Sequence, residues 1–283
     1  MMESTTDTLR AVDLPRMVGP CKRPLMVMPA NHSSAIIHYW AGKYPGKLGW
    51  LIGPTALPKT KLRQWMPFAL DNDAFSAWSK GREWSESAWV GMLDRVKLSG
   101  MSPRWVLVPD VVADRDATLA KWEQYEPVAG RYGWQLAIAV QDGMTPADLP
   151  EGAVIFVGGT TEWKWRSLPM WCATGRRVHV GRVNEVEKLF VCERLGVESV
   201  DGTGWMQGTE TGRQARALGA WLAGSLVDHD CFDFAHAMDN AQVRGYWPNV
   251  QAQIPRTQDV ANTTDSPERL SAAPCSSLVR DSE

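Results

Sequence analysis

Three aspartates, Asp71, Asp110 and Asp201, each come directly after a short apolar run of the sequence. A single aspartate at the end of a strand is as often a helix cap or a turn former as a catalyst. Three in equivalent positions can share one site, where repulsion and partial burial make carboxylic acids titrate at different pH values. One carboxylate could then act as a nucleophile while another transfers protons.

Other small or polar residues end the neighbouring runs. The side-chain amide of Gln141 could meet the edge of a planar ligand, or satisfy backbone groups at the end of a strand. The pair Gly158 and Gly159 would let a ligand approach the backbone closely, although such a pair also serves tight turns. For His179, which falls inside an apolar run, we expect a hydrogen-bonded structural histidine rather than a metal ligand.

The elements that must position these side chains are eight apolar runs that alternate with amphipathic stretches. The runs lack polar alternation, which is typical of strands buried on both faces of a parallel sheet. They cover residues 24–30, 49–54, 67–73, 105–110, 135–142, 153–159, 177–182 and 198–202. Helices are expected between them, at 85–100, 113–133 and 184–196. Such βα alternation predicts parallel strands.

Eight βα units in roughly 200 residues predict an α/β protein with a (β/α)8 TIM barrel as a single domain. An open doubly wound sheet is the alternative, but it usually has a glycine fingerprint after the first strand, and MPANHSS contains no glycine. We expect the barrel over residues 21–250, between flexible termini at 1–20 and 251–283. The active site of such a barrel lies at the carboxyl ends of its strands.

Composition limits the class of protein. The net charge of -2 gives no global positive field, so any contact with nucleic acid must be local. Five scattered cysteines argue against a disulfide framework or a Cys-rich zinc site and suit a reducing cytoplasm. The sequence has neither a signal peptide nor an apolar stretch long enough to span a membrane. We therefore expect a cytoplasmic protein without membrane contact, cofactor or metal, and of undefined oligomeric state.

Local basic clusters are the candidates for phosphate contacts at the barrel mouth. Such clusters are usually solvated faces, but Trp163 and Trp165 are interleaved with one of them, and aromatic and basic residues together suit a splayed nucleic-acid strand. The candidate residues are Lys59, Lys61, Arg63, Lys164, Arg166 and Arg182.

The order of these motifs resembles a known family, the tRNA-guanine transglycosylase superfamily. Its members are (β/α)8 barrels that exchange guanine for a 7-deazaguanine base. The resemblance covers residues 24 to 205 and is strong in order and spacing but weak in identity. The matching segments are MPA, LDNDAF, PD at 109–110, AVQDG, VGGT, VHVGR and SVDGTG.

The resemblance implies a role for each strand-end carboxylate. Asp201 corresponds to the nucleophile of the family, and Asp71 to the first acid of its D-S-G-G-F motif, which handles protons and positions the base. Asp110 resembles the acid that reads the Watson–Crick edge of the purine. The implied reaction passes through a covalent bond between an aspartate and the sugar.

The resemblance also implies a pocket for the base. Phe75 matches the aromatic residue of the D-S-G-G-F motif, and Gln141 the glutamine of V-Q-G-G. Gly159, beside Gly158, corresponds to a glycine whose backbone contacts the base, and Val180 stands near the residue on which the base packs.

Departures from the family pattern bear on the substrate. Asn72, Asp73 and Ala74 replace Ser-Gly-Gly, and Ser76 stands where glutamine is usual. The C-x-C-x-x-C motif is missing, so no zinc subdomain is expected. A short chain without that subdomain resembles the phage-type enzymes, which insert 7-deazaguanines such as preQ0 into DNA rather than tRNA. The expected partners are therefore DNA and a free 7-deazaguanine base, in a host cytoplasm.

Three alternatives remain open at this point. A hydrolytic glycosidase or nucleosidase could use the same pair of aspartates with water as the acceptor. The polynucleotide could be tRNA. The chain could also be a nucleic-acid-binding barrel without catalytic activity.

Overall fold

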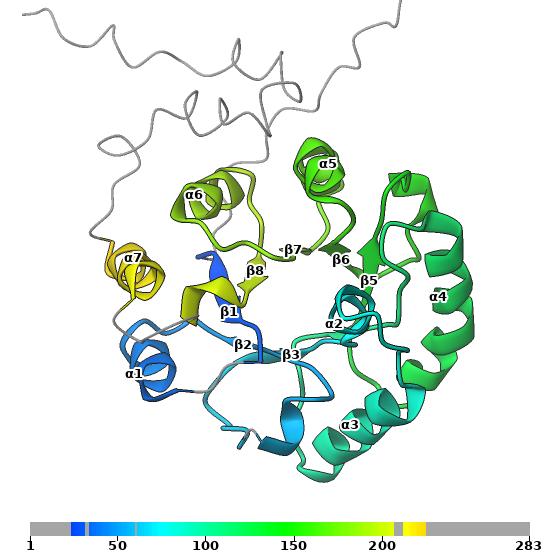
Figure 1. The fold of residues 1–283 in the computed structure, drawn as a ribbon, viewed down its shortest axis with the longest axis horizontal. Coiled ribbons are helices and arrows are strands. Elements are labelled where there is room, and N and C mark those ends of the chain that lie inside the picture. The colour runs from blue at the N-terminus through cyan, green and yellow to red at the C-terminus, as the bar shows by residue number, and fades with distance from the viewer. Residues whose placement is uncertain (1–23, 32–33, 60, 207–211, 225–283) are drawn as a thin grey trace, which may run out of the picture. The chain divides into compact units, whose positions relative to one another are not determined.

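The computed structural model describes residues 24–31, 34–59, 61–206 and 212–224. The termini expected at 1–20 and 251–283 lie outside these ranges, as does the last part of the expected barrel range. Strands and helices alternate along the described chain, and in Figure 1 the helices form a ring around the strands.

Eight short strands form one parallel sheet, and each strand falls inside one of the predicted apolar runs. They are β1 (Met26–Pro29), β2 (Trp50–Ile52), β3 (Phe68–Leu70), β4 (Val106–Leu107), β5 (Leu136–Val140), β6 (Val154–Val157), β7 (Val178–Val180) and β8 (Ser199–Gly202).

The sheet is nearly closed into a barrel. Its strand order is β1-β8-β7-β6-β5-β4-β3-β2, so the first and second strands are the two ends of the series. Isolated parallel bridges join these ends, from Val27 to Leu48 and from Ala30 to Leu51. The backbone N–H of Asn31 donates to the carbonyl of Leu51 over 2.8 Å. The predicted single-domain (β/α)8 barrel is thereby confirmed.

The helices lie where the amphipathic stretches predict them. The three that were expected are α3 (Glu86–Leu98), α4 (Arg115–Gly130) and α6 (Val186–Arg194). The others are α1 (Ala35–Lys43), α2 (Ala74–Ser79), α5 (Thr161–Ala173) and α7 (Arg213–Leu222), with short 3-10 turns η1 (Leu57–Lys59), η2 (Pro146–Asp148) and η3 (Gly204–Met206). Figure 1 shows α2 inside the ring of outer helices, close to β3. None of the helices in the described part of the chain is long and apolar enough to cross a membrane.

The inside of the barrel is filled by alternate residues of the strands. Because successive side chains of a strand point to opposite faces, residues two apart share the interior. The buried cluster consists of Met26, Met28, Leu51, Ala69, Trp105, Leu107, Ala137, Ala139 and Val154, with Ala30 and Phe156 packed against it. The same alternation places Asp71 after Ala69 and Gln141 after Ala139, at the carboxyl end of the barrel. Below, this end is called the mouth.

Tryptophans form a large part of the hydrophobic core. The side chains of Trp50, Trp89, Trp105, Trp171 and Trp205 are fully buried. Their role in the fold is therefore packing.

Candidate active site at the barrel mouth

Asp201 lies on β8 and is 6% exposed. Its Oδ2 is 3.1 Å from Nε2 of His179, and its Oδ1 accepts a hydrogen bond of 3.3 Å from the backbone N–H of Arg182. On the neighbouring strand, a Cβ at Gly181 would lie 2.9 Å from the ring of Phe156 and 3.4 Å from Asp201 Oδ2. Glycine at this position therefore leaves room beside the carboxylate.

Asp71 follows β3 and is partly buried. Its Oδ1 accepts a hydrogen bond of 2.8 Å from the backbone N–H of Asn72. Burial raises the pKa of Asp71 well above its usual value, and the charges of Asp73 and Asp201 raise it further. Asp71 therefore holds a proton at a pH where an ordinary aspartate is ionised, close enough to Asp201 for their charges to interact.

Asp110 follows β4 and is held by two side-chain amides. Asn72 Nδ2 donates to its Oδ1 over 2.8 Å, and Gln141 Nε2 donates to its Oδ2 over 2.7 Å. Burial raises the pKa of Asp110 to about 6, and these two hydrogen bonds and the charge of Arg182 limit the rise. The three predicted aspartates are thus gathered at the mouth, each in a different environment.

Gln141 connects Asp110 to the loop that follows β6. Its Oε1 accepts hydrogen bonds of 2.9 Å from the backbone N–H groups of Ala113 and Gly159. A Cβ at Gly158 would lie 3.0 Å from Gln141 Nε2. Three of the four hydrogen-bonding positions of this amide are therefore used inside the protein. The amide orders Asp110 and the Gly158–Gly159 turn, rather than standing free.

Gly159 has a left-handed conformation (φ 68°) that favours glycine. An added Cβ would lie 2.5 Å from Asp142 Oδ2 and 2.7 Å from the Trp163 ring. The glycine is required by this close packing, and its backbone carbonyl also accepts a hydrogen bond from Arg182 Nη2.

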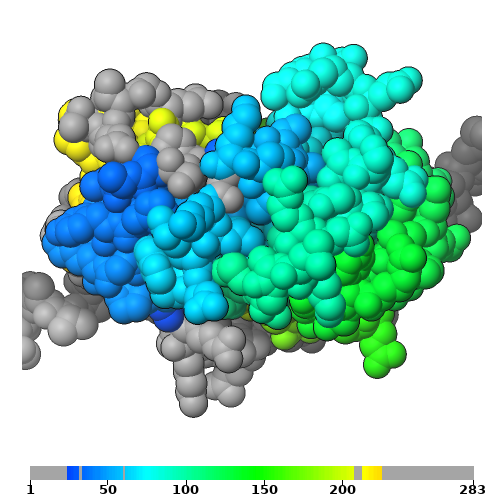
Figure 2. Space-filling view, turned by 90° about the horizontal axis from the view of Figure 1, so that it is seen from below, coloured from blue at the N-terminus to red at the C-terminus, as the bar shows by residue number. Residues whose placement is uncertain are grey.

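Arg182 joins several elements at the mouth. Its guanidinium lies over the ring of Phe75, 4.5 Å from the centroid, while its backbone N–H points at Asp201. Phe75 and Trp78 belong to α2 and are 41% and 60% exposed, with ring centroids 5.6 Å apart. The cyan segment that contains α2 protrudes from the surface in Figure 2. A small molecule bound at Asp201 would therefore lie next to Arg182 and Phe75.

Backbone strain is concentrated at the mouth. Among the described residues, the non-glycine residues with positive φ are Asn31, Asp73, Ala113 and Arg182, with φ between 53° and 60°. They follow β1, β3, β4 and β7, on the side where those strands end. Strained backbone of this kind often occurs at functional sites. This strain is a further reason to place the candidate site at this end of the barrel.

Lys164 requires a correction, because it does not face the solvent. Lys164 and Arg166, expected in a basic cluster at the barrel mouth, belong to α5, where the Thr160 side chain caps the helix by accepting from the Trp163 N–H. Lys164 is 1% exposed and donates 2.6 Å to the Gly181 carbonyl. Burial lowers its pKa to about 7, and the charge of Arg182 lowers it further.

Trp163 and Trp165 are also buried, at 8% and 4% exposure, so neither is available to stack on a nucleic acid. The predicted pairing of aromatic and basic residues at this place is wrong. The cause is that residues 163–165 belong to the first turns of α5, where all three side chains are buried. Four of the other predicted phosphate contacts are exposed: Lys59, Lys61, Arg63 and Arg166.

Val180 is fully buried. Its neighbour His179 points into the barrel, where it contacts Ser199 and Asp201, so Val180 points towards the outer helices. A base in the mouth would therefore not meet the Val180 side chain.

The sequence interpretation missed Asn72 and Ser199 as parts of the site. Asn72 is 1% exposed; besides Asp110 it contacts the carbonyl of Val108, to which its Nδ2 donates over 2.9 Å. Ser199 contacts His179. Two-residue periodicity was the available signal for Ser199, because it lies two positions before Asp201 on the same strand face.

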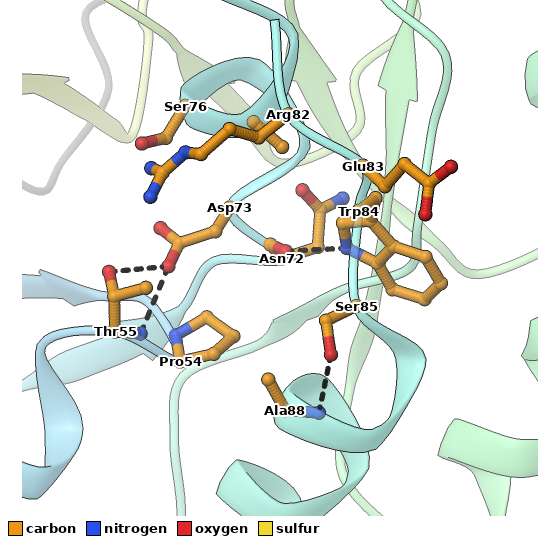
Figure 3. A pocket seen from close by; sticks show the side chains of 11 residues that line it. Pro54, Thr55, Asn72, Asp73, Ser76, Arg82, Glu83, Trp84, Ser85 and Ala88 are labelled. Atoms are coloured by element: carbon orange, nitrogen blue, oxygen red, sulfur yellow. Dashed lines mark hydrogen bonds between the residues drawn. The ribbon is translucent and has the colours of Figure 1, made fainter. Parts of the chain in front are cut away.

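A separate pocket of about 180 Å³ lies beside α2 (Figure 3). There Asp73 Oδ2 accepts hydrogen bonds from the backbone N–H and Oγ1 of Thr55, over 3.0 and 2.7 Å. Trp84 Nε1 donates to the Asn72 carbonyl over 2.8 Å, and the Arg82 side chain lies on the same side as Asp73 and Ser76 in Figure 3. Neither Asp71 nor Asp201 lines this pocket.

No group of three or more His, Cys, Asp or Glu side chains suited to a metal ion occurs in the ranges that the structure describes. The mouth contains the carboxylic acids of Asp71 and Asp201. Beside them, Asp110 accepts hydrogen bonds from Asn72 and Gln141. Neither a scan against protein-family models nor a search of curated proteins finds a match for this sequence.

Proposed function

We propose that this protein is a base-exchange transglycosylase that replaces guanine in a polynucleotide, DNA in preference to tRNA, with a 7-deazaguanine such as preQ0. The observation that supports this most is the pair Asp201 and Asp71. Asp201 Oδ1 accepts a hydrogen bond from the Arg182 backbone N–H and its Oδ2 lies 3.1 Å from His179 Nε2, whereas the pKa of Asp71 is raised by burial and by the charges of Asp73 and Asp201. One acid is suited to attack and the other to carry a proton.

In the first step, a carboxylate oxygen of Asp201 attacks C1′ of the target nucleotide. The glycosidic bond to guanine breaks through an oxocarbenium-like state, and a covalent bond forms between the aspartate and the sugar. Protonated Asp71 supplies the proton that the leaving guanine requires.

In the second step, the reaction runs in reverse with a different base. The incoming 7-deazaguanine gives its N9 proton to ionised Asp71, N9 attacks C1′, and the bond to Asp201 breaks. The sugar keeps its original configuration because it is inverted twice.

Asp110 is suited to hold the base in both steps. With a pKa of about 6 it is largely ionised at neutral pH, and a carboxylate accepts about four hydrogen bonds. Its two side-chain donors, Asn72 and Gln141, and one backbone N–H leave capacity for an N–H group on the Watson–Crick edge of a guanine-type base. Phe75, beside Arg182, offers an aromatic face to the ring.

The target atom is inaccessible in an intact duplex, so the nucleotide must be flipped out or the substrate must be single-stranded. The exposed cations Lys59, Lys61, Arg63 and Arg166 are the candidates for phosphate contacts. Their proposed role is sequence-independent attachment rather than base recognition.

The test is incubation of the protein with guanine-containing DNA or tRNA and a labelled 7-deazaguanine, followed by mass spectrometry of the nucleosides. We expect the label to enter DNA and guanine to be released in equal amount, and the Asp201→Asn variant to do neither. Release of guanine without entry of the label would replace the proposal with hydrolysis by the same aspartates. Binding without release of guanine would indicate a non-catalytic barrel.

A further inference from the structure

Beneath Asp201 in the barrel interior lies a histidine that the proposed reaction does not use. His179 and Ser199 are register partners on β7 and β8, and Asp201 is two residues beyond Ser199 on the same face. His179 Nδ1 is 2.8 Å from Ser199 Oγ, and its Nε2 is 3.1 Å from Asp201 Oδ2. The imidazole of His179 therefore links the hydroxyl of Ser199 to the carboxylate of Asp201.

The imidazole is fixed in place by its surroundings. His179 is 0% exposed and Ser199 is 1% exposed. The rings of Trp105 and Phe156 lie 4.9 and 4.7 Å from the imidazole, centroid to centroid. In this position Nδ1 of the imidazole contacts Ser199 and Nε2 contacts Asp201, so both nitrogens have a partner.

The contacts define which nitrogen carries the proton. An ionised Asp201 can only accept, so Nε2 must donate to it. In the neutral imidazole, Nδ1 is then an acceptor, and the hydroxyl of Ser199 is placed to donate to it. Ser199 thereby satisfies the nitrogen that carries no proton in the tautomer that gives Asp201 its hydrogen bond.

We propose that Ser199 and His179 are a positioning pair for Asp201, which directs Oδ2 into the barrel interior and leaves Oδ1 to attack the sugar. This inference rests on the proposed function, since it assumes that Asp201 is the nucleophile. The other hydrogen bond to the Asp201 carboxylate among the described residues is the longer one of 3.3 Å from the Arg182 backbone N–H. The pair therefore provides the shorter of the two contacts to the carboxylate.

Several other charges face Asp201. The basic groups of Lys164 and Arg182 and the acidic group of Asp71 all interact electrostatically with Asp201. His179 differs from these groups because its Nε2 is within hydrogen-bond distance of one carboxylate oxygen, Oδ2 of Asp201. Its removal should therefore change both the rate of attack and the pH at which attack begins.

The test measures the rate at which the full-length protein forms a covalent adduct with a guanine-containing single-stranded oligonucleotide, over a range of pH. For His179→Leu we expect adduct formation about 10- to 100-fold slower, the effect of one lost hydrogen bond to a charged group. The acid limb of the profile should move to higher pH, because the carboxylate loses a donor that stabilises its ionised form.

His179→Gln is the conservative variant, since its amide nitrogen can occupy the place of Nε2, and it should retain most of the rate and the wild-type acid limb. The rate of adduct formation in Ser199→Ala should lie between the rates of His179→Leu and His179→Gln. Val178→Ala is the matched control, because Val178 is buried next to His179 on β7 but faces away from Asp201. It should leave the pH profile unchanged.

A wild-type rate and pH profile in His179→Leu, alongside complete loss in Asp201→Asn, would overturn the positioning pair and leave the proposed function standing. Adduct formation in Asp201→Asn at the wild-type rate would overturn both. If His179→Leu fails to fold, judged by its denaturant midpoint, Ser199→Ala decides, and a wild-type profile for that variant rejects the proposal.

Discussion

Gln141 Nε2 donates a hydrogen bond of 2.7 Å to Asp110 Oδ2, across 31 residues of sequence. The other end of the same amide accepts from the Gly159 N–H. One buried side chain thus fixes both the acid proposed to hold the base and the turn beside it. The rigidity of the mouth depends on this amide.

Replacing Gln141 by leucine should weaken base binding. Asp110 would lose a donor, which raises its pKa above about 6 and shifts binding to higher pH. The Gly159 N–H would lose its acceptor, at a cost of about 1–3 kcal/mol in the free energy of unfolding. The measurements are the KM for 7-deazaguanine as a function of pH and denaturant unfolding. Gln135→Leu, at the amino end of β5 and exposed, is the control and should leave the KM unchanged. An equal KM in both variants would contradict this role.

Replacing Lys164 by methionine should remove a pH dependence of stability. The pKa of Lys164 is about 7 in the folded protein and 10.5 as its ordinary value, so the unfolded chain binds the extra proton between these values. The wild-type protein should therefore gain stability as pH rises from 7 towards 10, by up to about 1.4 kcal/mol per pH unit.

The measurement is the free energy of unfolding of both proteins at several pH values. Lys188→Met is the matched control: the Lys188 Nζ lies 5.6 Å from the same Trp165 ring, but it pairs with Glu185 over 3.0 Å. Parallel stability curves for wild type and Lys164→Met would show that Lys164 is not buried in this way.

Replacing Gly159 by alanine should be much more damaging than replacing Gly175. Both glycines have φ near 70°, so they share the cost of a left-handed alanine, but the added Cβ meets Asp142 and Trp163 only at Gly159. Nothing lies within 4 Å of the corresponding atom at Gly175. We expect about 1 kcal/mol of destabilisation for Gly175→Ala and about 2–4 kcal/mol for Gly159→Ala. Denaturant unfolding measures the difference, and equal losses would contradict the close packing.

Replacing Trp78 by alanine should weaken binding to the polynucleotide without destabilising the fold. Its side chain is 60% exposed beside Phe75, and stacking of one base on an aromatic ring contributes about 1–3 kcal/mol. The expected loss in affinity for a single-stranded guanine-containing oligonucleotide is therefore about 5- to 100-fold. Tyr39→Ala is the control, because Tyr39 is similarly exposed, at 57%, but belongs to the outer helix α1. The same loss in both variants, or none, would reject a role of α2 in binding.

The sequence alone determined the barrel and the positions of its functional side chains along the strands. Apolarity and turn residues are local properties, so each strand fell inside a predicted run, and each run ended at a residue of the mouth. The tertiary structure decided what those residues contact. The helical turn of α5 buries Lys164, and the amide of Gln141 is engaged by Asp110, Ala113 and Gly159.

The partnership of His179 with Asp201 likewise depends on the register between two strands. Alternation along one strand can tell which residues face inward, but it does not fix which of them meet across the barrel. Hydrogen bonds between residues about 20 or more positions apart follow from the closure of the sheet, and no local pattern contains that information.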